Sequence, residues 1–369
     1  MPVDERALTE RLIRYDTSDD EGIRNAAGFV KGWLESRDIT VDELEIRGLP
    51  LLTARVGAGD GPTVVFHGHL DVVPARPEQF DPVVQDDRIY GRGAYDMKGA
   101  LAAMMGALQE LRDAKGVRVL LAVVPDEESE EEIDRGTEVL IKNGYTGDFA
   151  ITGEPTDLHV GVQAKGVLAM RLEVIGMAAH GATPWLGDNA ILKALHAFRS
   201  IESLPFARES SDLFDRPSIN LGRILGGDAL NKVPDSCVID VDIRYLPGQD
   251  PREIRSQVSE LPDVAVVAQF HRAPAIVDRN NPFVRVLGES VSKVLDSETM
   301  SVGRDGASDA ICFINAGVPA VEFGPVGAGH HGPSEWVSIS SLQSYRRALV
   351  DFVRQIPDRL GDQRHLRIA

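Results

Sequence analysis

Two histidines and an aspartate follow a run of apolar residues in the segment VVFHGHLDVVPA, residues 64–75. His69 and Asp71 are two positions apart, so their side chains lie on the same face of an extended chain. The Asp71 carboxylate can then accept the second ring N–H of His69 and fix its tautomer, as carboxylates do for metal-binding histidines. A strand that only leaves the core would also carry polar residues here, so this segment alone leaves a metal site and a solvated loop both open.

Further carboxylates stand where apolar strands are expected to end. Asp96 precedes an expected helix in IYGRGAYDMKGALAAMM, where it either binds a metal or caps the helix. Glu127 and Glu128 close LLAVVPDEES, and adjacent side chains point in opposite directions, so one can bind a metal while the other faces a water. Glu154 follows DFAIT. Acidic turns are often merely solvated, but ligand sites of α/β sheets lie at the carboxyl ends of strands.

A pair of histidines, His330 and His331, lies in the glycine-rich segment VEFGPVGAGHHGPSEW after another apolar run. Together these strand ends offer histidines and several carboxylates, a combination that unrelated solvated turns would rarely produce. Such ligands suit zinc, and also manganese or cobalt, and the absence of thiolates is typical of open catalytic sites. Two neighbouring ions can activate water and polarise a carbonyl or phosphoryl oxygen.

The elements that must position these residues follow two patterns. Up to about residue 166 apolar strands alternate with amphipathic helices, which predicts an α/β layer whose sheet is covered on both faces. Residues 167–273 instead read strand, helix, two strands, helix and strand, the order of a ferredoxin-like α+β domain. Helix and apolar strand then resume. We therefore expect a catalytic domain of residues 1–166 and 274–369, with residues 167–273 inserted as a second domain.

The composition excludes several classes of protein. The chain has 369 residues, of which 43% are hydrophobic and 26% charged, so it is globular and long enough for two domains. A net charge of −18 argues against nucleic-acid binding, which needs basic patches. No apolar run approaches the roughly 18 residues of a membrane span, and MPVDERALTE lacks the pattern of a signal peptide. We therefore expect a cytoplasmic protein that binds neither nucleic acid nor a membrane.

A set of short motifs stands in a fixed order along the chain: HGHLDVVP, GRGAYDMKGALAAM, DEES, GEPT, AAHGATPWLGDNAI and HGPSEW. In this order and spacing they resemble the M20 metallopeptidase family, which includes acetylornithine deacetylase, succinyl-diaminopimelate desuccinylase, aminoacylase and glutamate carboxypeptidase. The resemblance covers essentially the whole chain, the inserted domain included. It implies two divalent metal ions, with zinc expected ahead of cobalt or manganese.

The resemblance also implies a role for each residue of the metal centre. The ligands fall into two sets that share one bridging carboxylate: His69, Asp96 and Glu154 for one ion, and Asp96, Glu128 and His331 for the other. Glu127 matches the general base of the family, and Asp71 matches the carboxylate that orients the first histidine. His67 and His330 would be neighbours of the centre and not ligands.

Substrate contacts are implied in and beside the inserted domain. His180 in MAAHGATP matches a histidine that reaches across a dimer interface to stabilise the oxyanion in the partner subunit's site, although a surface-loop histidine would look the same. Asn231 and Arg244 match positions that contact the substrate, although Arg244 could instead form an ion pair on the strand face. The remaining predicted contacts are Lys165, Arg304 and Gly306. The cationic ones are expected to anchor a free α-carboxylate.

The chain departs from the family pattern in a few places. EEEIDRG follows DEES, where the family usually runs quickly into glycines. Ala307 stands where many members have threonine, and Lys165 stands where some have arginine. Because these two substitutions concern substrate contacts, the subfamily stays open while the set of metal ligands is complete.

We expect a hydrolase that cleaves the amide bond of an N-acylated amino acid, with a metal-bridging water activated by Glu127. A dipeptidase or carboxypeptidase of the same family is one alternative. A metal-binding scaffold without turnover is another, but it predicts a broken ligand set or a missing base, and the sequence has neither. The small sheet of the inserted domain leaves an edge strand that pairing across a two-fold axis would cover, so we expect a homodimer with shared active sites.

Overall fold

The computed structural model describes residues 3–128 and 135–360. The chain divides into two compact units, of which the first comprises Met1–Val162, Val277–Val302 and Ser308–Ala369, and the second Gln163–Ile276 and Gly303–Ala307. Residues 129–134, which hold most of the acidic segment that departs from the family pattern, lie outside the described residues. Within the described ranges every helix is too short or too polar to cross a bilayer.

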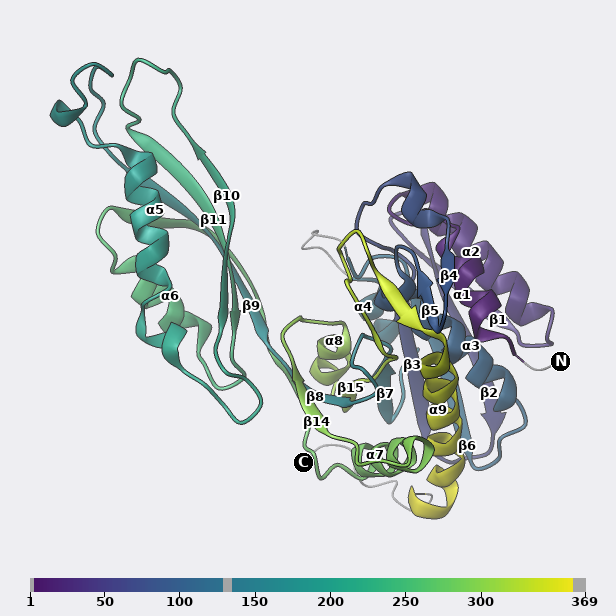
Figure 1. The fold of residues 1–369 in the computed structure, drawn as a ribbon. Coiled ribbons are helices and arrows are strands. Elements are labelled where there is room, and N and C mark those ends of the chain that lie inside the picture. Colours follow the sequence, from purple (N-terminus) through teal and green to yellow (C-terminus); the bar gives the residue numbers. More distant parts are fainter. Residues whose placement is uncertain (1–2, 129–134, 361–369) are drawn as a thin grey trace. The chain divides into compact units, whose positions relative to one another are not determined.

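The first unit is built on a mixed sheet whose inner strands are parallel (Figure 1). In spatial order the strands are β1 (Val41–Ile46), β2 (Leu49–Ala58), β6 (Val117–Val124), β3 (Thr63–His69), β7 (Phe149–Thr152), β15 (Ala320–Glu322) and β8 (Val160–Ala164). Pairing is parallel from β6 through β3 and β7 to β15, and antiparallel for β1, β2 and β8. The parallel strands are buried along nearly their whole length, as continuous apolar runs require.

Helices cover both faces of this sheet, as the sequence predicted. They are α1 (Glu5–Ile13), α2 (Asp20–Glu35), α3 (Gly99–Glu110), α4 (Gly136–Lys142), α7 (Pro282–Leu295), α8 (Ala310–Asn315) and α9 (Ile339–Leu360). On one face Val65 of β3 belongs to a cluster with Leu140 of α4 and Phe313 of α8. On the other face Gly68 of β3 lies against Leu101 of α3, and α3 packs against α9.

Helix α2 shows how the local sequence specifies these elements. The Asp19 side chain accepts a hydrogen bond from the Gly22 N–H and so caps the first turn. Its buried residues recur at helical spacing along one stripe: Ile23, Ala26, Ala27, Val30 and Leu34. Helix α2 is thus one of the amphipathic helices expected before residue 166.

A second, small antiparallel sheet brings two distant segments of the first unit together. Its order is β16 (Gly327–Ala328), β17 (Trp336–Ser338), β5 (Arg88–Tyr90) and β4 (Val83–Gln85). Trp336 pairs with Tyr90, so the chain just before β17 lies beside the chain just after β5. These two adjoining loops contain His331 and Asp96.

The second unit is a four-stranded antiparallel sheet with two helices on one face. The sheet order is β10 (Ser218–Gly226), β11 (Ser236–Tyr245), β9 (Gly166–Ile175) and β12 (Val264–Arg272), and the helices are α5 (Ala190–Ile201) and α6 (Pro251–Ser259). Alternate β11 residues such as Ile239 and Val241 pack with Phe198 of α5 and Val258 of α6. The expected ferredoxin-like arrangement is therefore confirmed. The short strands β13 (Ala275–Ile276) and β14 (Ser301–Arg304) pair with β8.

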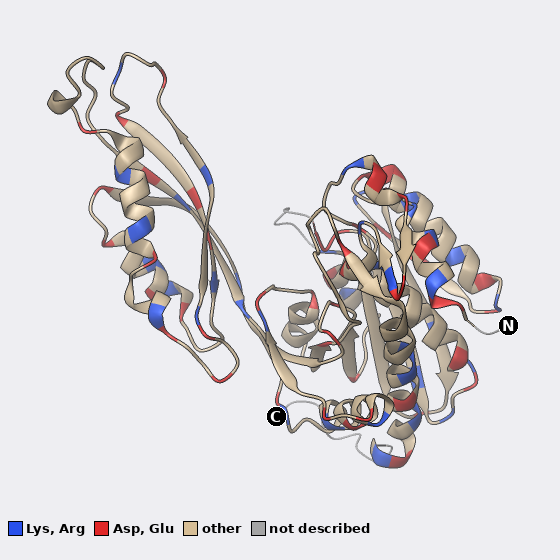
Figure 2. Cartoon of the chain, viewed as in Figure 1, with Lys and Arg blue, Asp and Glu red and all other residues tan. Residues whose placement is uncertain are grey.

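Charged residues are interspersed on the helices of both units, with basic and acidic side chains alternating along α9 (Figure 2). The opposite face of the second unit's sheet is also charged, since Arg171 of β9 forms a two-bonded ion pair with Asp240 of β11 at 2.7 and 2.9 Å. The sheet therefore has one face packed against helices and one face with charged side chains.

Candidate metal centre and active site

The candidate metal ligands stand at the carboxyl ends of neighbouring parallel strands. β3 ends at His69, Glu128 follows β6, and Glu154 follows β7. His69 lies beside Val124, the last residue of β6, so these strand ends meet at one edge of the sheet. His331 comes from the loop after β15 and β16. This edge is where α/β sheets place their ligand sites.

Asp96 does not cap α3, which was one of its two expected roles. It lies in the turn Ala94–Lys98 before the helix, and the N-cap position belongs to Lys98, which makes no side-chain capping bond. The Asp96 carboxylate faces His69 instead, with 3.2 Å between Oδ1 and the ring Nε2. The side chain is therefore available to a metal.

Two groups of side chains each offer ligand atoms within 4.8 Å of one another: His69, Asp96 and Glu154, and Asp96, Glu128 and His331. Nε2 of His69 lies 3.2 Å from Asp96 Oδ1 and 4.0 Å from Glu154 Oε1. Nε2 of His331 lies 2.8 Å from Glu128 Oε1 and 3.6 Å from Asp96 Oδ2. Each oxygen of Asp96 thus faces one group, the geometry that a bridging carboxylate needs.

The chemistry of these donors fits divalent cations. Burial raises the pKa of Glu154 well above its usual range, and the nearby carboxylates of Asp96 and Glu127 raise it further. Glu154 Oε1 is buried and has no hydrogen-bond partner among the described residues. A cation between these carboxylates would supply the missing partner and relieve their repulsion.

The pKa of His69 reflects the carboxylates that surround its ring. Burial alone would lower its pKa, but the Asp71 and Asp96 carboxylates raise the pKa well above the usual value. Its Nδ1 lies 2.9 Å from the main-chain oxygen of Asp71 and 3.4 Å from that residue's Oδ1. With Nδ1 protonated, the ring donates to the Asp71 carbonyl and keeps Nε2 for a metal.

The Asp71 carboxylate was expected to accept the ring N–H of His69, but the main-chain oxygen of Asp71 is closer to the ring, and the carboxylate has another task that the sequence did not predict. It accepts the main-chain N–H of Glu127 at 3.2 Å and that of Glu128 at 2.7 Å. Through these bonds Asp71 fixes the turn in which one glutamate joins the ligand group while the other does not. Glu128 is the one that belongs to a ligand group.

Glu127 is held beside the ligand groups by Arg135. The Arg135 Nη1 donates to the Glu127 carbonyl and to Asp309 Oδ1, both at 3.0 Å, and lies 3.5 Å from Glu127 Oε1. Burial raises the pKa of Glu127 to about 8, with a further contribution from the negative charge of Asp309. Metal ions bound to the neighbouring ligands would favour its ionised form.

Behind Glu127 lies a buried network that sequence reasoning missed. Thr137 donates to Asp309 Oδ2 at 2.5 Å, and the ring of His67 lies 2.7 Å from the Thr137 hydroxyl. Burial lowers the pKa of His67 to about 4, so the ring is neutral, and it belongs to neither ligand group. The only signal in the sequence was a charged residue, Asp309, directly before the apolar stretch AICFI.

Of the predicted contacts in the second unit, His180 and Asn231 are brought together. Both are exposed, and the Gly181 N–H donates to the Asn231 carbonyl at 2.7 Å, although the two residues are far apart in the chain. The His180 Nδ1 accepts the Ala182 N–H at 3.0 Å, which leaves Nε2 as the ring nitrogen outside this hydrogen bond. Both side chains are therefore accessible to a ligand or to another subunit.

Arg244 forms the ion pair that was one of its two expected roles. Its Nε donates to Asp242 Oδ2 at 3.0 Å, and its side chain is one-third exposed. Within the described part of the chain its Nη groups make no further hydrogen bond. The pairing orients the guanidinium and leaves its outer donors for an anionic ligand.

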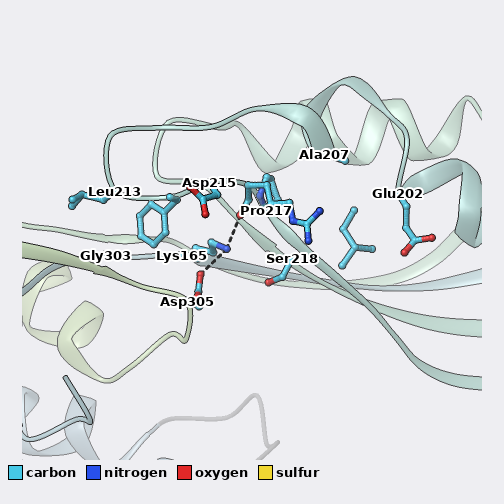
Figure 3. A pocket seen from close by; sticks show the side chains of 12 residues that line it. Lys165, Glu202, Ala207, Leu213, Asp215, Pro217, Ser218, Gly303 and Asp305 are labelled. Carbon is cyan, nitrogen blue, oxygen red and sulfur yellow. Dashed lines mark hydrogen bonds and ion pairs between the residues drawn. The ribbon is translucent and has the colours of Figure 1, made fainter. Parts of the chain in front are cut away.

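Lys165 lines a pocket of about 620 Å³ in the second unit (Figure 3). Its ammonium group is nearly buried and bonds to Asp305 Oδ1 at 2.8 Å and to the Arg216 carbonyl at 2.7 Å. Arg304 and Gly306 flank Asp305 in the chain. Because Lys165 already has a carboxylate partner, its role in anchoring a substrate stays a prediction.

The chain matches the peptidase family M20/M25/M40 over residues 65–355. A succinyl-diaminopimelate desuccinylase from Marinobacter nauticus is 29% identical over 374 residues, which cover 94% of this chain and 98% of the relative. A desuccinylase from Leptothrix cholodnii is 31% identical over 373 residues, which cover 93% and 97%. The similarity to these relatives therefore runs through both units.

Solved structures share the fold at lower identity. A tripeptidase from Staphylococcus aureus has a TM-score of 0.78 at 21% identity, covering 96% of this chain and 98% of its own. A metallo-carboxypeptidase of the M20 family from Sulfolobus solfataricus has a TM-score of 0.77 at 20% identity, covering 96% and 99%.

Proposed function

Because the chain belongs to the peptidase family M20/M25/M40, it is a metal-dependent amide hydrolase, and we propose that it removes the acyl group from an N-acylated amino acid. The observation that carries the proposal is Asp96, whose two oxygens face two separate groups of histidine and carboxylate ligands beside Glu127. The desuccinylase relatives favour this reaction over peptide cleavage. A scaffold without turnover is disfavoured because the ligand groups and the adjacent glutamate are complete.

The proposed ligands of the two ions are the members of the two groups, with zinc ahead of cobalt or manganese because the donors are imidazole and carboxylate. When bound, such ions polarise the amide carbonyl and lower the pKa of water. Glu127 then takes a proton from the attacking water and passes it to the leaving amine. Asp71 accepts the main-chain N–H of Glu127 and Arg135 donates to its carbonyl, so both hold this residue in place during these transfers.

Substrate recognition is assigned to the second unit and the segments beside it. Arg244 presents unengaged guanidinium donors that suit the free α-carboxylate of an acylated amino acid. Asn231, Lys165, Arg304 and Gly306 are the other proposed contacts. Cys237 and Cys312 are buried and not joined in a disulfide, the usual state of cysteines in a reducing cytoplasm, which we propose as the location.

We further propose a homodimer in which the second unit, near the sequence-based boundaries 167–273, supplies His180 to the partner's site as an oxyanion donor. Support comes from the surface of this unit. Within the described ranges, all large exposed apolar residues except Val83 and Met300 belong to it. Leu225 lies on the edge strand β10, which leads into the loop that holds Asn231 against His180. An apolar edge of this kind is typical of an isologous interface.

A substrate panel tests the reaction. The purified protein, loaded in turn with zinc, cobalt or manganese, is assayed on N-succinyl and N-acetyl amino acids and on dipeptides. We expect turnover of N-acyl amino acids above that of dipeptides. Faster cleavage of the dipeptides would overturn the substrate assignment while leaving the enzyme class intact.

Glu127→Gln tests the general base. We expect turnover to fall by roughly 10²- to 10⁴-fold, the usual contribution of general acid–base catalysis, at unchanged metal content by elemental analysis. Retention of most of the parent turnover would remove Glu127 from this role.

Complementation tests the shared site. His180→Ala and Glu127→Gln protomers, each inactive alone, should regain activity as heterodimers, because one of the two sites then has both an intact Glu127 and an intact His180. Leu225→Asp should give a monomer by sedimentation, while Val267→Asp on the opposite edge strand β12 should remain a dimer. Full activity of a monomer would rule the shared site out.

A further inference from the structure

The motif HGPSEW contains an acidic residue, Glu335, that belongs to neither ligand group and takes no part in the proposed reaction. Its side chain is 1% exposed and lies between two loops of the first unit. One loop, residues 91–96, carries Asp96, and the other, residues 329–335, carries His331. A buried carboxylate between two ligand-bearing loops needs an explanation, because burial of an unsatisfied charge is costly.

Both oxygens of Glu335 are fully used by donors of the first loop. Oε1 accepts the main-chain N–H groups of Tyr95 and Asp96, both at 3.0 Å. Oε2 accepts the Gly93 N–H at 2.9 Å and Nη1 of Arg92 at 2.7 Å. The carboxylate therefore fixes the main chain at Asp96 itself and at the turn before it.

Arg92 extends this link to the second loop. Its Nη2 donates at 3.2 Å to the carbonyl of Gly332, the residue after His331. Its side chain is 3% exposed, so the ion pair with Glu335 is buried. A buried ion pair adds little net stability when it replaces apolar packing, but it can define one arrangement of the groups around it. Here those groups are the main chains that carry two ligands.

We propose that Glu335 is a positioning residue that holds the Asp96 and His331 loops at the separation required by the ion bound to Asp96, Glu128 and His331. The inference rests on the proposed function, since it presumes that the centre binds metal. Asp96 belongs to both ligand groups but His331 to only one. Loss of Glu335 should therefore weaken binding at the His331 group more than at the group of His69 and Glu154.

Calorimetric titration of the chelator-treated full-length protein with zinc tests this directly. The wild type should show two binding events, and His331→Ala identifies the event that belongs to its group. Glu335→Gln should weaken that event by roughly 10- to 100-fold, the usual effect of removing a partner that orients ligands. The physical reason is that the glutamine amide has one oxygen, which can accept only two of the four hydrogen bonds that Glu335 accepts. Its NH₂ group would face the other two donors and could not accept from them.

Asp87→Asn is the matched control. Asp87 also ties the β5 hairpin to the chain at β17, accepting the Ser338 hydroxyl at 2.7 Å and the Ser340 N–H at 2.9 Å. It makes no contact with either ligand loop among the described residues. Both binding events should therefore stay as in the wild type, even though a comparable set of hydrogen bonds is altered.

Arg92→Lys covers the case in which Glu335→Gln does not fold, as judged by circular dichroism. Lysine keeps the charge beside Glu335 but lacks the second arm that reaches Gly332, so the His331 event should weaken by roughly 3- to 10-fold. Unchanged affinities in the folded Glu335→Gln protein or, failing that, in Arg92→Lys would overturn the positioning role. Absence of zinc binding by the wild type would instead contradict the proposed function.

Discussion

In the first unit candidate metal ligands are buried, since His69 is 1% exposed and Glu154 is 9% exposed. In the second unit large apolar groups lie outside, with Leu225 58% exposed and Trp185 75% exposed. Buried carboxylates cost free energy unless a cation neutralises them. Exposed apolar side chains likewise cost free energy unless another surface covers them.

The first unit therefore depends on a bound cation, and the second on a surface that covers its apolar side chains. The ligand groups of the first unit are assembled within it, and their main chain is held by hydrogen bonds that Asp71 and Glu335 accept and Arg135 donates. The proposed recognition residues of the second unit, His180 and Asn231, are exposed and have few fixed contacts. We infer that changes in the first unit act on turnover of every substrate, whereas changes in the second act on substrate choice and assembly.

The largest effect is expected from Asp96→Asn. The neutral amide has one oxygen and no charge, so it cannot bridge two cations, and both ligand groups lose a member. Turnover should fall by more than about 10³-fold because metal and general-base contributions are lost together. Elemental analysis and a turnover assay measure this. Asp157→Asn is the control, since that exposed carboxylate accepts the Tyr95 hydroxyl outside both groups; an equal loss there would contradict the assignment.

Arg135→Ala should be next in size. It leaves Asp309, whose side chain is 0% exposed, without its buried ion pair, and breaking such a pair costs about 3 kcal/mol of the free energy of unfolding. Turnover should also fall, because Glu127 loses its tether. Urea unfolding measures the stability. Arg171→Ala removes the solvent-exposed pair with Asp240 in the second unit and should leave the unfolding free energy near that of the parent. A similar loss of unfolding free energy in both variants would contradict the inferred difference between the two units.

Metal removal should act on one unit only. A ligand whose free concentration is 100 times its dissociation constant stabilises the folded state by about 2.7 kcal/mol. Removal of the metal by a chelator should therefore lower the free energy of unfolding by about that amount. Hydrogen exchange followed by mass spectrometry should show faster exchange in peptides around His69, Asp96 and Glu154. Peptides from β9 to β12 should keep their rates. Faster exchange throughout the second unit would show that metal supports both.

The smallest effect is expected from Arg244→Ala. The KM for substrates with a free α-carboxylate should rise roughly 10- to 100-fold, the range of a lost charge-assisted hydrogen bond, while kcat changes less. Comparing each substrate with its carboxamide measures the loss of selectivity. Arg223→Ala, which removes another exposed cation of the same sheet, should keep the parent's discrimination. Unchanged selectivity in Arg244→Ala would take that residue out of the pocket.

The sequence predicted most of the fold because its periodicities are local. The alternating apolar strands and helices up to residue 166 form the helix-covered sheet of the first unit, and residues 167–273 form the ferredoxin-like sheet that their order of elements predicted. Polar residues at the ends of parallel strands must meet at one edge, and His69 and Glu154 are close together for this reason. Asp96 comes from a turn outside these strands, and only the family resemblance implied that it would join them.

The partners of these residues could not be predicted, because they depend on contacts between segments distant in the chain. Asp71 was expected to orient a histidine through its carboxylate, but that carboxylate also holds the turn of Glu127 and Glu128. Asp309 reaches Arg135 from a position 174 residues away, and Glu335 reaches Asp96 from one 239 residues away. No local pattern encodes such a distance.

The sequence by itself determined the types of the elements, the class of donor and the family, because each depends on residue identity and on spacing of a few positions. Only the tertiary structure decided which oxygen of Asp96 faces which histidine, that Lys98 and not Asp96 occupies the N-cap of α3, and that Lys165 is already paired with Asp305. The physical reason is that hydrogen bonds and ion pairs are fixed to tenths of an ångström by packing of the whole unit, whereas periodicity specifies only which face a side chain occupies.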